Sequence, residues 1–270
     1  MSSHLPIGVF DSGVGGLTVV RALRQRLPQE SIVYLGDTAR LPYGTKSAES
    51  ITRYATQATD HLVSRGIKLL VVACNTASAV SIGPLETRFA PLPVVGVVEP
   101  GARAAVSAGG HHHLVLATES TVRRHAYARA IHDLSPEAQV DELPCSLFVA
   151  LAEEGWTDGP IAEAVARRYL AQVSRPGQAP DTVVLGCTHF PLLADAVRAA
   201  VGPGPIIVDS ATTTAATVDA VLGGRDLRTT STDRGRLTLL ATDGADRFAR
   251  VGSRFLGETI LPVDVEIVDL

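Results

Sequence analysis

The stretch Thr182–Pro191, TVVLGCTHFP, decides the fold class. Its first four residues are β-branched or aliphatic with no polar alternation, which is typical of a strand that is buried on both faces. The run ends at Gly186 and is followed by a thiol, a hydroxyl and an imidazole, from Cys187, Thr188 and His189. Strands covered on both faces belong to parallel sheets flanked by helices, so the stretch predicts an α/β protein with polar residues at a strand's carboxyl end.

A second stretch, Ile67–Ser78 (IKLLVVACNTAS), follows the same plan: an apolar strand, a small residue, Cys74, polar residues and then an expected helix. In open α/β sheets, functional sites form at the carboxyl ends of strands. One cysteine after an apolar strand would indicate packing, but two in matching phrases favour a functional role. The third cysteine, Cys145 in ELPCSLF, has no matching phrase, and we predict a structural role for it.

The rest of the chain alternates short apolar runs with helical patterns, which predicts doubly wound parallel sheets. Clusters of Gly and Pro near residues 100 and 205 mark the best internal boundaries, and each reads as a surface loop. The expected strands are Ile7–Phe10, Ile32–Leu35, Ile67–Val72, Val94–Val98, Leu114–Ala117, Thr182–Leu185, Ile206–Val208, Leu237–Ala241 and Val263–Val268. The expected helices include Leu17–Leu27, Ala48–Ser64, Val122–Leu134, Gly159–Val173 and Ala245–Phe255.

Composition narrows the class of protein. The chain has 270 residues, 46% of them hydrophobic, and a formal net charge of −4. That charge gives no electrostatic basis for binding nucleic acid. No window reaches the roughly 18 apolar residues of a membrane span, and the first residues lack a secretory pattern. Three cysteines form no disulfide framework and fit a reducing compartment, so we expect a cytoplasmic protein that binds neither nucleic acid nor membrane.

Two loops carry further candidate residues. In FDSGVGGLTVV, residues 10–20, Asp11 and Ser12 precede a glycine-rich turn into a helix. The glycine spacing is not the dinucleotide fingerprint, and no lysine completes a phosphate-binding loop, so a helix cap and an anion site both stay open. In GDTARLPYGTKS, residues 36–47, a loop with Asp37 and Tyr43 follows a strand and either binds a ligand or simply turns.

The residues alone leave several chemistries open for the two thiols. A thiolate can be a nucleophile, a metal ligand or a base, and Asp11 and His189 are candidate activators. A cysteine hydrolase would use Cys187 as nucleophile and His189 as base, which leaves Cys74 without a role. A metal-binding module would use Cys74, Cys187, His189 and Asp11 as ligands.

Six motifs in order across nearly the whole chain resemble the glutamate racemase family, whose members work without a cofactor. They are IGVFDSGVGGLTV, LGDTARLPYG, ACNTASA, ATESTVRRHAYARAI, CSLFVALAEEGW and LGCTHFPLL. The two cysteine motifs together are highly specific, whereas either alone is only suggestive. The resemblance implies an isomerase that moves the α-proton of glutamate with two cysteines on opposite faces of the substrate.

The resemblance also assigns roles. It implies that Cys74 deprotonates D-glutamate with help from Asp11, and that Cys187 deprotonates L-glutamate with help from His189. Glu153 matches a position on the His189 side. The matched substrate contacts are Asp11, Ser12, Pro42, Tyr43, Gly44, Asn75, Thr76, Thr118, Thr121, Thr188 and His189.

No cofactor is implied. The chain's only lysines, Lys46 and Lys68, lie after a loop glycine and at the start of a strand, where we would not place a Schiff-base lysine. Carbanion character must then be stabilised by preorganised donors and by exclusion of water.

The implied architecture is two doubly wound parallel-sheet domains in a pseudo-symmetric arrangement with the active site in the cleft between them. The first domain would hold residues 1–98 and 209–270, and the second residues 99–208. A homodimer that supplies D-glutamate for peptidoglycan in a bacterial cytoplasm is also implied. An aspartate racemase or another amino-acid racemase of the same superfamily is the nearest alternative.

Overall fold

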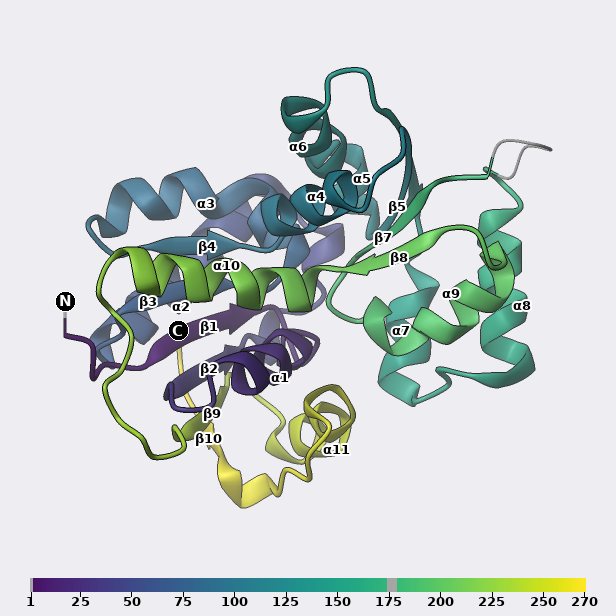
Figure 1. The fold of residues 1–270 in the computed structure, drawn as a ribbon. Coiled ribbons are helices and arrows are strands. Elements are labelled where there is room, and N and C mark those ends of the chain that lie inside the picture. The colour runs from purple at the N-terminus through teal and green to yellow at the C-terminus, as the bar shows by residue number, and fades with distance from the viewer. Residues whose placement is uncertain (1, 174–178) are drawn as a thin grey trace. The chain divides into compact units, whose positions relative to one another are not determined.

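The computed structural model describes residues 2–173 and 179–270, and the chain divides into two compact units. The first unit comprises Met1–Val97 and Ala211–Leu270, and the second comprises Val98–Ser210 (Figure 1). Each unit contains its own parallel sheet, so the predicted class of two doubly wound α/β sheets is confirmed.

The first unit holds a six-stranded parallel sheet in the order β10-β9-β2-β1-β3-β4. Its strands are β1 (Ile7–Asp11), β2 (Ile32–Gly36), β3 (Leu69–Val72), β4 (Val94–Gly96), β9 (Leu237–Ala241) and β10 (Val265–Ile267). Its helices are α1 (Leu17–Arg26), α2 (Ala48–Ser64), α3 (Asn75–Phe89), α11 (Ala245–Leu256) and most of α10 (Ser210–Gly224). Short 3-10 turns are η1 (Thr38–Arg40), η2 (Tyr43–Thr45) and η4 (Pro262–Asp264).

Continuous apolar runs form this sheet because both of its faces are covered. Phe10 and Val72 belong to the buried cluster that packs against α2 and α3. Their neighbours along the strands point to the other face, where Tyr34 of β2 contacts Phe248 of α11, with ring centroids 6.0 Å apart. Successive strand residues point to opposite faces, so a run such as LLVV must be apolar at every position.

The second unit holds a four-stranded parallel sheet in the order β6-β5-β7-β8. Its strands are β5 (His112–Ala117), β6 (Gln139–Pro144), β7 (Thr182–Gly186) and β8 (Ile206–Asp209). Its helices are α4 (Val98–Ser107), α5 (Glu119–Arg123), α6 (Ala126–Leu134), α7 (Leu147–Glu154), α8 (Gly159–Leu170) and α9 (Ala194–Val201), with the 3-10 turn η3 (Phe190–Leu193) before α9.

Three expectations need correction. The Gly/Pro cluster near residue 100 is the first turn of α4 and not a surface loop, because Pro100 falls where a helix tolerates proline. The predicted helix Val122–Leu134 is two helices, α5 and α6, broken at His125, whose φ is 48°. The edge strand β6 was not predicted, since its sequence QVDELP carries no apolar run.

No helix within the described residues is long and apolar enough to cross a lipid bilayer.

Candidate active site

The carboxyl ends of the strands in the first unit carry the predicted residues of that unit. Asp11 pairs with Gly36 of β2, and Phe10 pairs with Val72 of β3. Ser12, Asp37 and Cys74 therefore follow three neighbouring strands at one edge of the sheet. This is the edge where open α/β sheets place functional groups.

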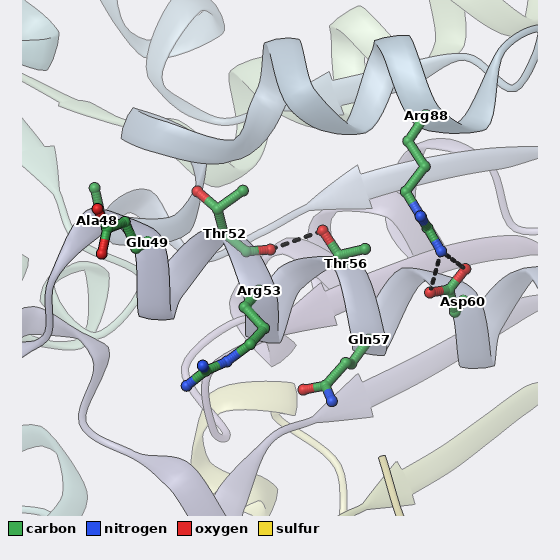
Figure 2. A pocket seen from close by; sticks show the side chains of 8 residues that line it. All are labelled: Ala48, Glu49, Thr52, Arg53, Thr56, Gln57, Asp60 and Arg88. Atoms are coloured by element: carbon green, nitrogen blue, oxygen red, sulfur yellow. Dashed lines mark hydrogen bonds and ion pairs between the residues drawn. The ribbon is translucent and has the colours of Figure 1, made fainter.

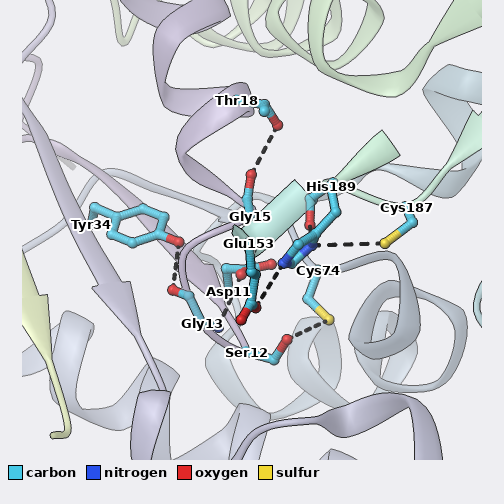
Figure 3. A network of polar contacts seen from close by, with 11 residues as sticks. Asp11, Ser12, Gly13, Gly15, Thr18, Tyr34, Cys74, Glu153, Cys187 and His189 are labelled. Atoms are coloured by element: carbon cyan, nitrogen blue, oxygen red, sulfur yellow. Dashed lines mark hydrogen bonds and ion pairs between the residues drawn. The ribbon is translucent and has the colours of Figure 1, made fainter. Parts of the chain in front are cut away.

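Cys74 is the N-cap of the long helix α3. Its Sγ accepts a hydrogen bond from the backbone N–H of Ala77 at 3.4 Å. The same sulfur lies 3.5 Å from Ser12 Oγ, within hydrogen-bonding distance (Figure 3). Asn75 and Thr76 form the first turn of α3 and are buried. A helix N-terminus favours the thiolate form of a cysteine, so this position suits a thiol that takes up and releases a proton.

The glycine-rich turn after β1 contacts the Asp11 carboxylate. Asp11 is completely buried, and its Oδ2 accepts a hydrogen bond from Gly13 N at 2.9 Å. The hydroxyl of Tyr34 donates to Gly13 O at 2.8 Å (Figure 3). A β-carbon on Gly16 would lie 2.6 Å from the Asp11 β-carbon, so only glycine fits there. Gly16 is also the N-cap of α1.

The predicted contacts Pro42, Tyr43 and Gly44 lie on the loop after β2. Tyr43 is buried, and its hydroxyl donates to Asp37 Oδ2 at 2.5 Å. Burial, followed by the Asp37 carboxylate, raises the pKa of Tyr43 well above its usual value, so this hydroxyl keeps its proton. Pro42 is exposed and Gly44 is half-buried.

The second unit presents an equivalent edge. Ala117 of β5 pairs with Gly186 of β7 on one side and with Pro144 of β6 on the other. Thr118, Cys145 and Cys187 therefore follow three neighbouring strands. Thr118 Oγ1 lies 3.1 Å from Thr121 Oγ1, and the hydroxyl pair stands at the start of α5.

Cys187 lies beside an imidazole that a carboxylate orients. Cys187 Sγ is 3.9 Å from His189 Nδ1, and His189 Nε2 is 3.1 Å from Glu153 Oε1 (Figure 3). If Nε2 carries the proton that Glu153 accepts, Nδ1 presents a lone pair toward the thiol. Thr188 Oγ1 lies 3.4 Å from the same Nδ1. This arrangement can move a proton between Cys187 and His189.

Cys145 differs from the other two buried thiols. Burial, with a smaller contribution from nearby Cys187, raises the pKa of Cys145 to about 12. Its backbone N–H donates to Ala117 O at 2.9 Å. Because β5 lies between β6 and β7, the backbones at Cys145 and Cys187 are roughly 10 Å apart at about 4.8 Å per strand, too far for a disulfide. These features agree with a structural role.

Each unit thus brings its own predicted residues together: Asp11, Ser12, Asn75 and Thr76 near Cys74, and Thr188, His189 and Glu153 near Cys187. Sequence reasoning missed two groups of the first unit. The Ala77 amide could have been found from the cysteine that precedes the helix, because Cys74 stands at an N-cap position. Tyr34 gave no signal, since a tyrosine within an apolar strand reads as core.

A surface hollow between α2 and α3 includes none of the predicted site residues (Figure 2). Arg88 of α3 reaches Asp60 of α2 there, with 3.1 Å between the guanidinium and the carboxylate. Arg88 and Asp60 thus neutralise each other's charge in the hollow. Among residues 2–173 and 179–270, no group of three or more His, Cys, Asp or Glu side chains could hold a metal ion.

The fold and these sites define a class: an α/β protein with two parallel sheets, each delivering a buried cysteine with polar partners at its carboxyl edge. Residues 17–218 match the Asp/Glu/Hydantoin racemase family. The chain belongs to this family of racemases.

Several relatives are similar over more than nine-tenths of their length. A glutamate racemase of Geobacter metallireducens is 50% identical over 253 residues, which are 93% of this chain and 92% of that protein. The glutamate racemase of Francisella tularensis, solved in complex with D-glutamate, has a TM-score of 0.90 at 34% identity and covers 99% of this chain and 98% of its own. The glutamate racemase of Thermus thermophilus, solved with β-chloro-D-alanine, has a TM-score of 0.89 at 40% identity and covers 100% and 99%.

Proposed function

We propose that this chain is a glutamate racemase that interconverts L- and D-glutamate by cofactor-independent proton transfer between two thiols. The observation that carries the proposal is the pair of local sites: Cys74 and Cys187 each follow a parallel strand and each has a polar partner within hydrogen-bonding range. The 50% identity to a glutamate racemase supports glutamate as the substrate.

In the proposed reaction, one cysteine thiolate removes the α-proton and the other cysteine, as a thiol, donates a proton to the opposite face of the α-carbon. Cys187 removes the proton of L-glutamate, and Cys74 removes that of D-glutamate. The proton balance closes in each turnover, because the acceptor thiolate becomes a thiol and the donor thiol becomes a thiolate.

The partners of the two thiols prepare them for this exchange. His189, oriented by Glu153, takes the proton of Cys187 to form the thiolate and returns it later. The Ala77 amide and the helix terminus stabilise the negative sulfur of Cys74. Asp11, which accepts a hydrogen bond from the Gly13 amide, assists Cys74 as the resemblance implies. Amide and hydroxyl groups for the substrate carboxylates come from Asn75, Thr76, Thr118 and Thr188.

The test is proton NMR of L-glutamate with metal-free and pyridoxal-free protein in deuterated water, with optical rotation followed in parallel. Cys74→Ala and Cys187→Ala proteins run beside the parent, and Cys145→Ala is the matched control for loss of a buried thiol. We expect the parent and Cys145→Ala to lose the α-proton signal and the optical rotation together. Neither of the other variants should racemise.

Other outcomes would select a different function. Exchange with aspartate but not glutamate would assign an aspartate racemase. An acyl-enzyme burst that depends on Cys187 alone, without α-proton exchange, would assign a cysteine hydrolase. Stoichiometric bound metal with no exchange of any amino acid would assign a metal-binding module.

Further proposals concern the oligomeric state and the cellular role. We propose a cytoplasmic homodimer that supplies D-glutamate for peptidoglycan, on the strength of the family resemblance. Sedimentation of the purified protein tests the dimer. A strain depleted of this chain tests the supply role, because added D-glutamate should restore its growth.

A further inference from the structure

The loop Asp37–Thr45 carries three of the predicted substrate contacts, Pro42, Tyr43 and Gly44, yet its best-anchored side chain is one that touches no substrate in the proposed reaction. We infer that Asp37 is a positioning residue whose buried carboxylate holds this loop in the conformation that meets glutamate. The role toward glutamate rests on the proposed function, whereas the contacts of Asp37 do not.

Three side chains donate hydrogen bonds to the Asp37 carboxylate. Tyr43 Oη donates to Oδ2 at 2.5 Å, and Arg40 Nε and Thr242 Oγ1 each donate to Oδ1 at 3.0 Å. Arg40 Nε also lies 2.8 Å from Oδ2, within ion-pair distance. Asp37 is completely buried. A buried carboxylate is costly unless it is paired and hydrogen-bonded, and here one cation and two hydroxyls satisfy it. The Asp37 carboxylate therefore holds the side chains of Arg40 and Tyr43 next to each other.

The first turn of the loop is joined to the end of β9. Ala39 N donates to Thr242 Oγ1 at 2.9 Å, so the threonine that donates to Asp37 also accepts from the loop. Thr38 Oγ1 donates to Asp243 O at 2.5 Å and accepts from Asp243 N at 2.9 Å. Asp37 thus lies at the junction of two strand ends that are about 200 residues apart in the sequence.

Arg40 and Tyr43 of the loop also contact α2. An Arg40 guanidinium nitrogen donates to Gln57 Oε1 at 2.6 Å, and the guanidinium carbon lies 4.3 Å from the centroid of the Tyr54 ring. The Tyr43 ring lies between Tyr54 and Phe10, with centroid distances of 5.7 and 6.1 Å. The phenol is therefore part of the core of the first unit.

This packing determines which groups of the loop remain for a ligand. The Tyr43 hydroxyl is committed to Asp37, so the loop offers Pro42 and its own backbone. A β-carbon on Gly13 would lie 3.6 Å from Leu41 Cδ2, which places the loop beside the glycine-rich turn next to Ser12. Loss of an Asp37 contact should therefore displace a substrate-binding backbone, not a proton carrier.

Kinetics separate these two effects. A loosened loop spends less time in the competent conformation, and the apparent affinity for substrate falls by the same fraction. Proton transfer within the bound complex continues. The expected signature is a rise in KM for both enantiomers with kcat nearly unchanged, and a purely structural role would instead lower thermal stability without moving KM.

The variants remove one contact at a time. Tyr43→Phe deletes only the phenol hydroxyl, Thr242→Val deletes the second hydroxyl, and Asp37→Asn removes the charge at constant size. Tyr169→Phe is the matched control for loss of a hydrogen-bonded tyrosine hydroxyl, and Asp219→Asn is the control for loss of a carboxylate that binds arginine. Both control residues lie outside the loop and the proposed site.

Two measurements are made on each full-length protein. The first is the pair of kinetic constants for L- and D-glutamate. The second is backbone hydrogen–deuterium exchange in residues 38–46 without substrate, read by mass spectrometry. For Asp37→Asn and Tyr43→Phe we expect exchange about tenfold faster, KM about tenfold higher and kcat within about threefold of the parent. Both controls should match the parent in both measurements.

Two results would overturn the inference. Unchanged exchange in Asp37→Asn would mean that the carboxylate does not hold the loop. Faster exchange with unchanged KM would mean that the loop does not serve the substrate. Should Asp37→Asn fail to fold, the two hydroxyl deletions decide by the same criteria. If the parent does not act on glutamate, the proposed function fails, and exchange alone then decides whether Asp37 holds the loop.

Discussion

The surroundings of the two thiols to which we assign proton transfer differ between the two units. Cys74 caps a helix of 15 residues and receives a backbone N–H at 3.4 Å, so fixed dipoles stabilise its sulfur. Cys187 is followed by the short turn η3, and its sulfur lies 3.9 Å from the His189 imidazole, whose other nitrogen lies 3.1 Å from Glu153. The Ala77 amide and the Ser12 hydroxyl that lie within hydrogen-bonding range of Cys74 are neutral groups, whereas the imidazole beside Cys187 is a titratable base.

Because the surroundings differ, the proton transfers at Cys74 and Cys187 can have different rates. The equilibrium constant between L- and D-glutamate is one, so any variant must change kcat/KM equally in both directions. An asymmetry between the sites therefore shows in exchange and isotope effects and not in the ratio of the two kcat/KM values.

The largest effect should come from removing either thiol. Cys74→Ala and Cys187→Ala should each lower racemisation about 10³-fold, because each loses a positioned acid–base group. In deuterated water Cys74→Ala should slowly exchange the α-proton of L-glutamate only, and Cys187→Ala that of D-glutamate only. NMR of each pure enantiomer measures this, and exchange of the same enantiomer by both variants would contradict the assignment of faces.

A second, smaller effect should follow from His189→Asn. We expect kcat/KM to fall about 10²-fold in both directions, since the thiol of Cys187 loses the base that deprotonates it. With α-deuterated substrate, the primary isotope effect should rise for L-glutamate and fall for D-glutamate, because transfer at Cys187 becomes the slow step.

Glu153→Gln should shift the isotope effects in the same sense but by less, since glutamine keeps a hydrogen bond to Nε2. His132→Asn is the matched control, as that histidine lies on α6 and bonds to a backbone carbonyl. Equal isotope effects for both enantiomers in His189→Asn would show that the imidazole does not serve Cys187 alone.

Ser12→Ala should have a weaker effect on the opposite side. Loss of a hydroxyl near the Cys74 sulfur should lower kcat/KM about fivefold, the size of one neutral hydrogen bond. Here the isotope effect should rise for D-glutamate. Ser64→Ala, which removes an exposed hydroxyl at the end of α2, serves as the control. A rise for L-glutamate instead would reverse the comparison between the two sites.

The smallest effect concerns stability in the second unit. His113 is buried on β5 with Nδ1 2.7 Å from Thr182 Oγ1, and burial lowers the pKa of His113. The unfolded chain therefore binds this proton more readily than the folded chain. The contribution to stability is complete above the unfolded pKa of about 6.5 and is lost as the pH falls from there toward the lowered value.

Urea unfolding followed by the fluorescence of Trp156, the chain's single tryptophan, measures this effect in the second unit. The unfolding free energy of the parent should decrease between pH 7 and pH 5.5. His113→Gln keeps a hydrogen-bonding group for Thr182 and should show a flatter dependence. An identical slope in both proteins would remove His113 from the explanation.

The sequence predicted those parts of the fold where burial alone dictates residue type. The runs Ile7–Phe10, Leu69–Val72 and Thr182–Leu185 are covered on both faces, so their apolar character survives without any knowledge of the neighbours. The edge strand β6 escaped prediction because one side of it has no strand partner and its residues are mostly part-exposed. The break at His125 escaped because histidine is only a weak signal for a left-handed conformation and is also common within helices.

In the candidate site, too, the sequence predicts some features and not others. Chain position alone places Cys74 and Cys187 at strand ends, as the motifs indicated. The direction of a side chain depends on partners that are distant in sequence, and Tyr43 illustrates this. Its motif predicts a substrate contact, and the structure adds that its hydroxyl donates to Asp37, which Thr242 also contacts in a buried cluster. Which groups surround a thiol can be read only once the strands are in register.

The most direct test of the two-thiol account is an early time point of the parent reaction with L-glutamate in deuterated water. Mass spectrometry after separation of the enantiomers gives the deuterium content of each. Two monoprotic groups on opposite faces should yield D-glutamate that carries deuterium at the α-carbon, while the remaining L-glutamate still carries protium. D-glutamate that retains the substrate's protium would indicate a single base on one face and would contradict the account.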